Sequence, residues 1–184
     1  FLKSDNTELR TIIEEFQRVA LAHPEIAFTF VKDDNVELFN LRAGALRQRV
    51  LGIMGNSFDQ RLVPVQETTD VVGVEGFVGK PEFAKRSKGE QYLFLNKRFI
   101  KNGYLHHAIS RAYDELLPEK NQPSYFLFLS VPTERVDINI HPTKTEVKFE
   151  DEKVIYAILM SAVRRSLGRY NIAPSIDFNE ENSF

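Results

Sequence analysis

The chain has 184 residues, enough for one sizeable hydrophobic core and too few for two full ones. Hydrophobic residues make up 42% and charged residues 27%, which is the balance of a folded domain and excludes a disordered chain. The absence of cysteine excludes disulfides, cysteine-ligated zinc, iron–sulfur clusters and thiol catalysis. No apolar run reaches the roughly 20 residues that span a bilayer, so we expect a cytoplasmic protein without a membrane partner.

The two ends of the sequence predict a piece of a longer protein. The chain opens at Phe1 without an initiator methionine and enters a helical pattern almost at once. Residues 171–184 carry no basic residue and no clear hydrophobic period, so we expect them to form a disordered linker or tail.

The first third of the sequence predicts a helix, a hairpin and a second helix. Apolar residues recur at helical spacing from about residue 5 to residue 22, with Ser4 or Asp5 as the cap, and the pattern stops at Pro24. Residues 26–41 alternate around turn-forming residues 33–35, which predicts a β-hairpin. A short helix follows over residues 45–54, and Gly55 ends it.

The remaining sequence alternates strands and helices. Strands are predicted near 61–67, 70–78, 91–95, 99–100, 125–131, 136–140 and 145–149. Helices are predicted over about 104–117 and 151–168, with Gly168 as the stop of the second, and residues 79–90 form a long connection. We therefore expect an α+β fold, a single two-layer lobe in which helices pack on a mixed β-sheet.

Positive charge is concentrated in one part of the chain. The net charge is −2, yet residues 80–101 hold seven basic and two acidic residues, so this segment carries +5 and the remainder −7. Such a segment can hold phosphates through counterion release, and Asn96 and Asn102 add neutral hydrogen-bond donors. A solvated loop that only keeps the protein in solution is the alternative.

A proline-centred turn is the second local feature. In the run Asn139-Ile140-His141-Pro142-Thr143-Lys144, Pro142 breaks a strand pattern, and the turn can project Lys144 from the end of a sheet. A lysine ammonium suits a phosphate oxygen, although an exposed strand lysine near Glu146 explains the same residues.

The sequence lacks the signatures of a self-contained active site. It has no Walker-type phosphate loop, no G-x-G-x-x-G after a strand and no G-x-S-x-G elbow. The four histidines are not spaced with acids as metal ligands, so we expect no metal site. The glycines of residues 73–79 lie in a strand pattern and predict a bulged or closely packed strand.

Two motifs resemble those of MutL-family DNA mismatch repair proteins. Residues 139–149, Asn-Ile-His-Pro-Thr-Lys-Thr-Glu-Val-Lys-Phe, resemble the family signature N-V-H-P-x-K-x-E-V-x-F. Residues 91–98 and 108–113 are similar to the family's V-N-x-R strand and its A-I…A-Y helix. Here Lys97 replaces the glycine often found between the asparagine and the arginine, which leaves the geometry of that turn open.

The resemblance implies a fold and a set of site residues. MutL proteins have an N-terminal ATPase region of the GHKL group, in which an ATP-binding lobe precedes a second, ribosomal-protein-like lobe that this chain matches. By resemblance, residues 1–22 close the ATPase lobe or pack on the sheet, and residues 23–170 form the transducer domain. Lys144 corresponds to the lysine that contacts the ATP γ-phosphate, and Arg98 to a DNA-binding position. The other expected DNA contacts are Lys97, Lys101, Lys85, Arg86 and Lys88.

The resemblance also implies partners and an activity for the parent protein. We expect an ATPase that uses ATP and Mg²⁺ in the upstream lobe, forms a homodimer, and binds DNA and a MutS-type mismatch recognition protein near the nucleoid. This chain alone is expected to be inactive and to bind no cofactor. The alternative is a stand-alone nucleic-acid-binding or protein-docking module without nucleotide chemistry.

Overall fold

The structure, a computed structural model, describes residues 4–87, 89–137 and 147–180, and side chains as far as residue 170. The chain divides into two compact units, Phe1–Gln60 and Arg61–Phe184. The first helix lies in the first of these units. The expected division into residues 1–22, 23–170 and 171–184 stays a prediction. No helix in the described part of the chain is long and apolar enough to cross a membrane.

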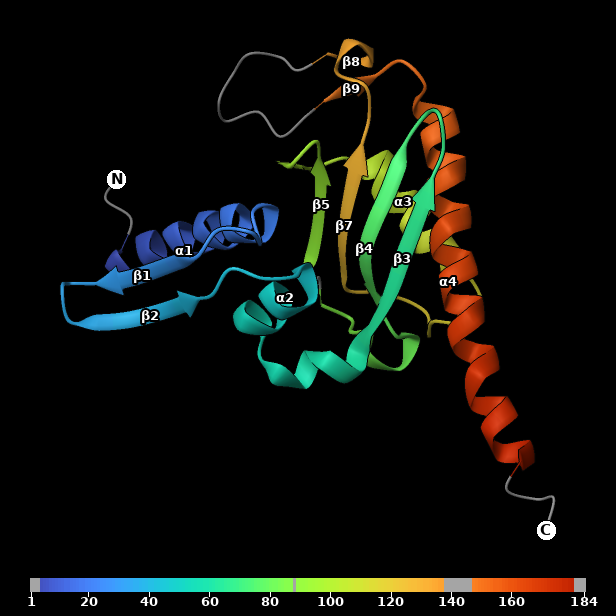
Figure 1. The fold of residues 1–184 in the computed structure, drawn as a ribbon, viewed down its shortest axis with the longest axis horizontal. Coiled ribbons are helices and arrows are strands. Elements are labelled where there is room, and N and C mark those ends of the chain that lie inside the picture. The colour runs from blue at the N-terminus through green and yellow to red at the C-terminus, as the bar shows by residue number, and fades with distance from the viewer. Residues whose placement is uncertain (1–3, 88, 138–146, 181–184) are drawn as a thin grey trace. The chain divides into compact units, whose positions relative to one another are not determined.

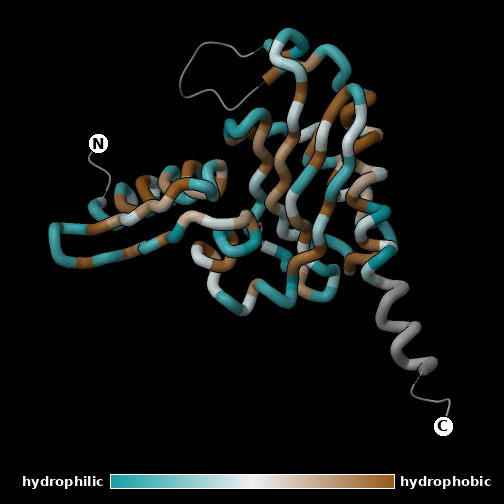
Figure 2. Tube along the Cα trace, viewed as in Figure 1, coloured by the Kyte–Doolittle hydropathy of each residue, from teal (hydrophilic) through white to brown (hydrophobic). Residues whose placement is uncertain are grey.

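The first unit is a helix packed on a β-hairpin, with a second helix after it (Figure 1). Helix α1 (Asp5–Ala22) precedes the antiparallel strands β1 (Phe28–Lys32) and β2 (Val36–Leu41), and α2 (Leu46–Met54) ends before Gly55. These elements confirm the predicted helix, hairpin and short helix. The ring of Phe16 lies 5.0 Å from that of Phe30 and 5.2 Å from that of Phe39, so aromatic contacts hold α1 on the hairpin. The hairpin tip is hydrophilic (Figure 2).

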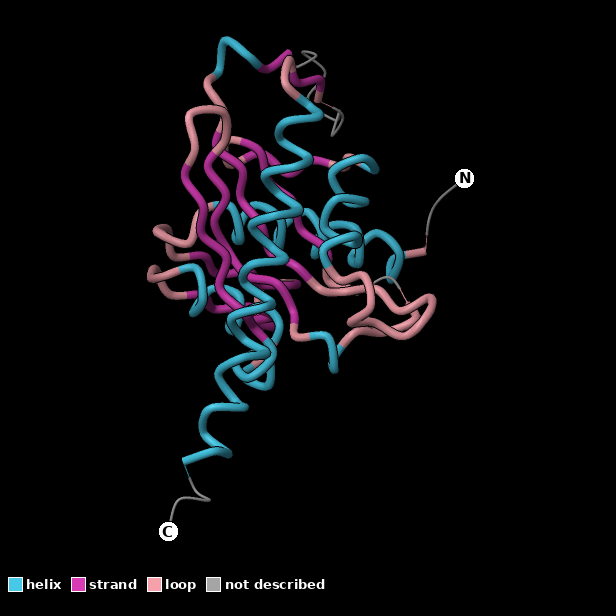
Figure 3. Tube along the Cα trace, turned by 90° about the vertical axis from the view of Figure 1, so that its right-hand side faces the viewer, coloured by secondary structure: helices cyan, strands magenta, loops and turns pink. Residues whose placement is uncertain are grey.

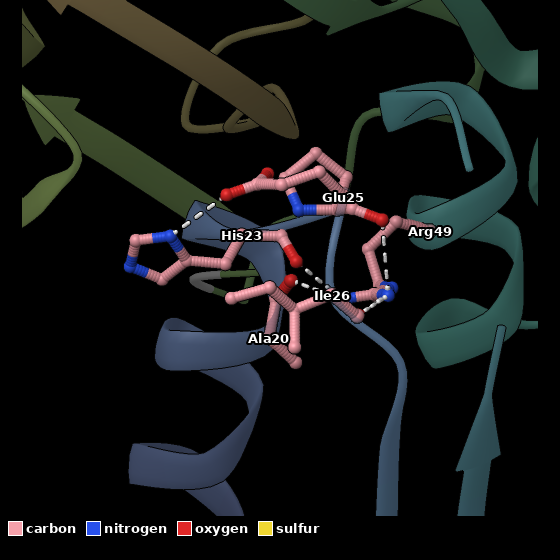
Figure 4. Close-up of polar contacts among 6 residues, drawn as sticks. Ala20, His23, Glu25, Ile26 and Arg49 are labelled. Atoms are coloured by element: carbon pink, nitrogen blue, oxygen red, sulfur yellow. Dashed lines mark hydrogen bonds and ion pairs between the residues drawn. The ribbon is translucent and has the colours of Figure 1, made fainter. Parts of the chain in front are cut away.

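A buried arginine joins the segments of the first unit (Figure 4). Arg49 on α2 is only 2% exposed, and its guanidinium donates to the carbonyl oxygens of Ala20 at 2.6 Å and His23 at 3.0 Å. It also donates to the carbonyls of residues 24, 26 and 42. Burial lowers the pKa of Arg49, Glu25 opposes that shift, and the guanidinium stays charged at neutral pH. One cation thus satisfies the carbonyls at the end of α1 and in the loop that follows it.

We predict that Arg49→Ala destabilises the protein by about 3 kcal/mol, because it leaves several carbonyls without a donor and opens a cavity. The matched control is Arg47→Ala on the same helix, which removes a largely exposed ion pair with Asp59 and is expected to cost no more than about 1 kcal/mol. Urea unfolding followed by circular dichroism measures both. Equal losses for the two variants would contradict the structural role of Arg49.

The second unit is built on a five-stranded mixed sheet with the order β3-β4-β7-β5-β6. Its strands are β3 (Leu62–Thr68), β4 (Gly73–Gly79), β5 (Gln91–Leu95), β6 (Arg98–Ile100) and β7 (Tyr125–Ser130). All neighbouring pairs are antiparallel except β5 and β7, which run parallel, as a crossover through a helix requires. A short pair, β8 (Val136–Asp137) and β9 (Lys148–Phe149), lies outside this sheet.

Two helices supply the second layer of this unit. Helices α3 (Gly103–Ala112) and α4 (Glu152–Glu180) bury residues such as Ile109 and Leu159 against Val74, Leu93 and Leu127 of the sheet. The view turned by 90° shows α4 running along the strands (Figure 3). The predicted α+β class, with helices packed on a mixed sheet, is confirmed.

A glycine allows the two central strands to approach each other. Gly76 on β4 has φ of +132°, and a Cβ there would lie 2.0 Å from the carbonyl oxygen of Phe126 on β7. Only glycine fits this backbone conformation and this contact without a shift of the strand. The close packing predicted for the glycine-spaced strand is therefore confirmed.

The C-terminal ends of α3 and α4 differ from the predicted ends. Helix α3 stops at Ala112, not at 117, because buried Tyr113 donates its hydroxyl to the Gly79 carbonyl and the chain then turns. Burial also raises the pKa of Tyr113, so its hydroxyl remains a donor. Helix α4 continues to Glu180 and passes the predicted stop at Gly168, since a glycine weakens a helix interior without ending it.

Candidate nucleic-acid interface

The turn between β5 and β6 carries Lys97 and leads into Arg98, two of the predicted DNA contacts. Asn96 has φ of 46° and Lys97 φ of 68°, and Leu95 pairs with Arg98 across the turn. Two successive residues with positive φ form the tight hairpin turn whose twist matches that of the strands, and Asn-Gly is its preferred sequence. Lys97 therefore occupies the position at which the family often has glycine, and it accepts a left-handed conformation there.

The side chain of Asn96 attaches this turn to the end of β7. Its Nδ2 donates to the carbonyl of Val131 at 2.8 Å, and its Oδ1 accepts from the Val131 amide at 3.0 Å. The Asn96 amide also donates to the carbonyl of Leu129 at 2.8 Å. Three hydrogen bonds thus fix the hairpin that carries Lys97 and Arg98.

Both asparagines expected as neutral donors bond nearby backbone groups. Asn102 caps α3, with its side-chain oxygen accepting from the Leu105 amide at 3.0 Å, and Asn96 Nδ2 donates to the Val131 carbonyl at 2.8 Å. Their role as donors to a ligand stays a prediction. The charged residues remain as candidate contacts.

The predicted basic residues lie along one edge of the sheet. Strand β6 is the edge strand of the sheet. Lys97 lies in the turn before it, half-buried Arg98 lies on it, and exposed Lys101 follows directly after it. Lys97 and Lys101 thus flank the three residues of β6 on either side, and Arg98 is its first residue.

The connection from β4 to β5 brings a second basic segment to the same part of the sheet. Lys85 forms an isolated antiparallel bridge with Gln122, whose amide donates to the Lys85 carbonyl at 2.6 Å. Gln122 and Lys101 line one cavity. The exposed residues Lys85 and Arg86 belong to the segment that pairs with Gln122. We call Lys85, Arg86, Lys97, Arg98 and Lys101 the basic edge.

Three other basic residues are not counted in the basic edge. Lys80 lies 4.6 Å from the ring centroid of Tyr170, so its charge is used in a packing contact with α4. Lys88 and Lys144 lie outside the described residues. Among the described residues, no group of three His, Cys, Asp or Glu side chains could hold a metal ion.

The two adjacent histidines point in different directions, as expected for neighbours on a helix. His106 Nδ1 lies 2.8 Å from the Tyr125 hydroxyl, and His107 Nδ1 lies 2.8 Å from the Tyr156 hydroxyl. The two imidazoles thus bond different tyrosine hydroxyls.

Comparison with known proteins decides the family. The family described as DNA mismatch repair protein, C-terminal domain, matches residues 50–168. The DNA mismatch repair protein MutL of Flavobacterium psychrophilum is 59% identical over 181 residues, which are 98% of this chain and 29% of that protein. The chain belongs to the MutL family of DNA mismatch repair proteins. It spans less than a third of the length of this relative.

Solved structures support the same fold. The N-terminal domain of a DNA repair protein matches with a TM-score of 0.74 and 17% identity, over 91% of this chain and 53% of that one. The Aquifex aeolicus MutL ATPase domain complexed with ADP matches with a TM-score of 0.52 and 23% identity, over 72% of this chain and 46% of that one. At these identities the match concerns the fold, which is that found within MutL ATPase-domain structures.

The turn predicts a stability difference between two variants of Lys97. Lys97 has a left-handed backbone conformation, which is strained for any residue with a Cβ. Lys97→Gly removes this strain and is expected to be about 0.5–1 kcal/mol more stable than Lys97→Ala, which keeps it. Both variants lose the same charge and the same side-chain contacts, so the comparison isolates the backbone. Thermal unfolding measures the difference, and a more stable alanine variant would contradict the turn geometry.

Proposed function

We propose that this chain is the lobe of a MutL protein that couples ATP binding in an upstream ATPase lobe to DNA binding. The observation that carries the proposal is the basic edge, five basic residues on two segments, one of which contains the edge strand β6 while the other pairs with Gln122. Cations spaced along an edge suit a chain of phosphates and position it without reading its sequence. Membership of the MutL family supports DNA as the polyanion.

The nucleotide part of the proposal concerns Lys144. In the sequence this residue falls between the segments that form β8 and β9, and it is outside the described residues. Its ammonium is the kind of group that suits a phosphate oxygen. We propose that ATP and Mg²⁺ are held by the upstream lobe and that Lys144 contributes the contact to the γ-phosphate from this chain. The ADP bound in the Aquifex aeolicus neighbour is consistent with a nucleotide in the parent protein.

The two parts would be coupled through a change in lobe arrangement. When ATP is bound, its γ-phosphate supplies an anchor that favours the arrangement in which Lys144 reaches it. Closure and homodimerisation would then place the basic edges of two copies around DNA, and a MutS-type protein would deliver the complex to a mismatch. Residues 1–22 and 23–170 would act in this as the closing helix and the transducer domain.

We predict that Arg98→Glu lowers DNA affinity about tenfold at low salt and reduces the slope of log affinity against log salt by about one. The test joins this chain to its upstream region and follows binding of duplex DNA by fluorescence anisotropy. Lys153→Glu on α4 is the matched control, since it is exposed and makes the same change in net charge away from the basic edge. A salt slope that Arg98→Glu leaves unchanged would remove DNA contact at this position.

For the same two-lobe protein, Lys144→Ala is expected to lower ATP turnover about tenfold or more, because it removes a charge from the γ-phosphate. Lys148→Ala, on exposed β9 four residues later, is the control and should keep turnover near that of the unaltered protein. Steady-state phosphate release measures both. Unchanged turnover in Lys144→Ala would exclude this role.

The alternative function is a stand-alone nucleic-acid-binding module. A domain unrelated to an ATPase lobe upstream of this chain would favour it.

A further inference from the structure

A cavity of about 340 Å³ lies where β6 separates from β5. The two strands pair only from Leu93 to Leu95, and after Ile100 the chain turns through Lys101 into α3. The first residue of β5, Gln91, is therefore not paired with β6 and lines the cavity together with Gln122. Cavities of this size accept small organic groups such as a nucleobase.

Two carboxamides are held side by side in this cavity. Gln91 Nε2 donates to the carbonyl of Pro123 at 3.0 Å and lies 3.4 Å from Gln122 Oε1. Within the described residues, the Gln91 oxygen and the Gln122 nitrogen make no described hydrogen bond, so the cavity offers one acceptor and one donor. The edge of a base carries donor and acceptor groups that amides of this kind can bond.

Three residues of the lining carry rings, Phe99, His106 and Tyr125. The Tyr125 hydroxyl lies 2.8 Å from His106 Nδ1, and burial raises the pKa of Tyr125, so the hydroxyl stays neutral and orients the imidazole. Because Tyr125 is only 4% exposed, the partly exposed ring of Phe99 is the surface on which a base would stack.

The cavity also meets both segments of the basic edge. Lys101 is one of its lining residues, and Lys85 pairs through its backbone with Gln122. A planar polar group in the cavity would thus have Lys101 beside it, and Lys85 would lie on the segment that pairs with Gln122. A nucleotide presents such a planar base next to negatively charged phosphates. Resting on the proposed DNA binding, we propose that this cavity receives the base of an unpaired nucleotide in a DNA strand, with Lys101 and Lys85 contacting the adjoining phosphates. A base within a duplex stack cannot enter such a site.

The test compares two single-stranded oligonucleotides of equal length and charge, one carrying adenine bases and one abasic. In fluorescence anisotropy with the two-lobe protein, the adenine strand should bind roughly fivefold or more tightly. Gln122→Leu should abolish that preference and leave the affinity for the abasic strand unchanged. The control is Gln66→Leu on β3, at the opposite edge of the sheet, which should keep the preference.

The outcomes separate this site from the proposed function. Equal binding of both strands overturns the base site and leaves phosphate binding standing, whereas loss of binding to both removes the proposed function as well. A preference that survives in Gln122→Leu also overturns the site. If Gln122→Leu does not fold, nuclear magnetic resonance of the unaltered protein decides: the adenine strand must shift the His106 ring signals more than the abasic strand does.

Discussion

The attachment of Asn96 to Val131 is the interaction on which the arrangement of the basic edge depends. Both hydrogen-bonding ends of the amide are used on one residue, at 2.8 and 3.0 Å. They join the β5–β6 turn to the end of β7, the strand that lies parallel to β5. The turn is thereby fixed although Lys97 must adopt a positive φ. A flexible turn would disperse the charges of Lys97 and Arg98, and a fixed one holds them on the sheet edge.

Two further constraints act where side chains cannot be exchanged freely. Because Gly76 has no side chain, the backbone of β4 can approach that of β7 closely in the middle of the sheet. In the other unit, buried Arg49 uses its guanidinium to satisfy the carbonyls between α1 and β1. A desolvated cation is costly unless several acceptors surround it, and these carbonyls supply that environment. At both positions, backbone carbonyl groups and not neighbouring side chains determine which residue fits.

Much of the fold was predictable because its elements have local signatures. The period of apolar residues identified α1, the hairpin of residues 26–41 and α2, and the glycine spacing indicated a closely packed β4. Helix ends were less predictable. Tyr113 ends α3 through a contact with Gly79, 34 residues earlier in the chain, and no local pattern announces such a contact. Arg49 was missed for the same reason, since nothing near it in sequence distinguishes it from exposed Arg42 or the ion-paired Arg47.

The sequence by itself determined the class of each element, the MutL-family motifs and the concentration of positive charge in residues 80–101. Only the tertiary structure decided which groups the residues of that segment contact. It assigned Lys80 to Tyr170, used Asn96 and Asn102 on backbone groups, and brought Lys85 to Gln122 and thus to the cavity beside Lys101. The physical reason is that strand order and side-chain partners depend on contacts between distant residues, whereas periodicity and composition report only on neighbours along the chain.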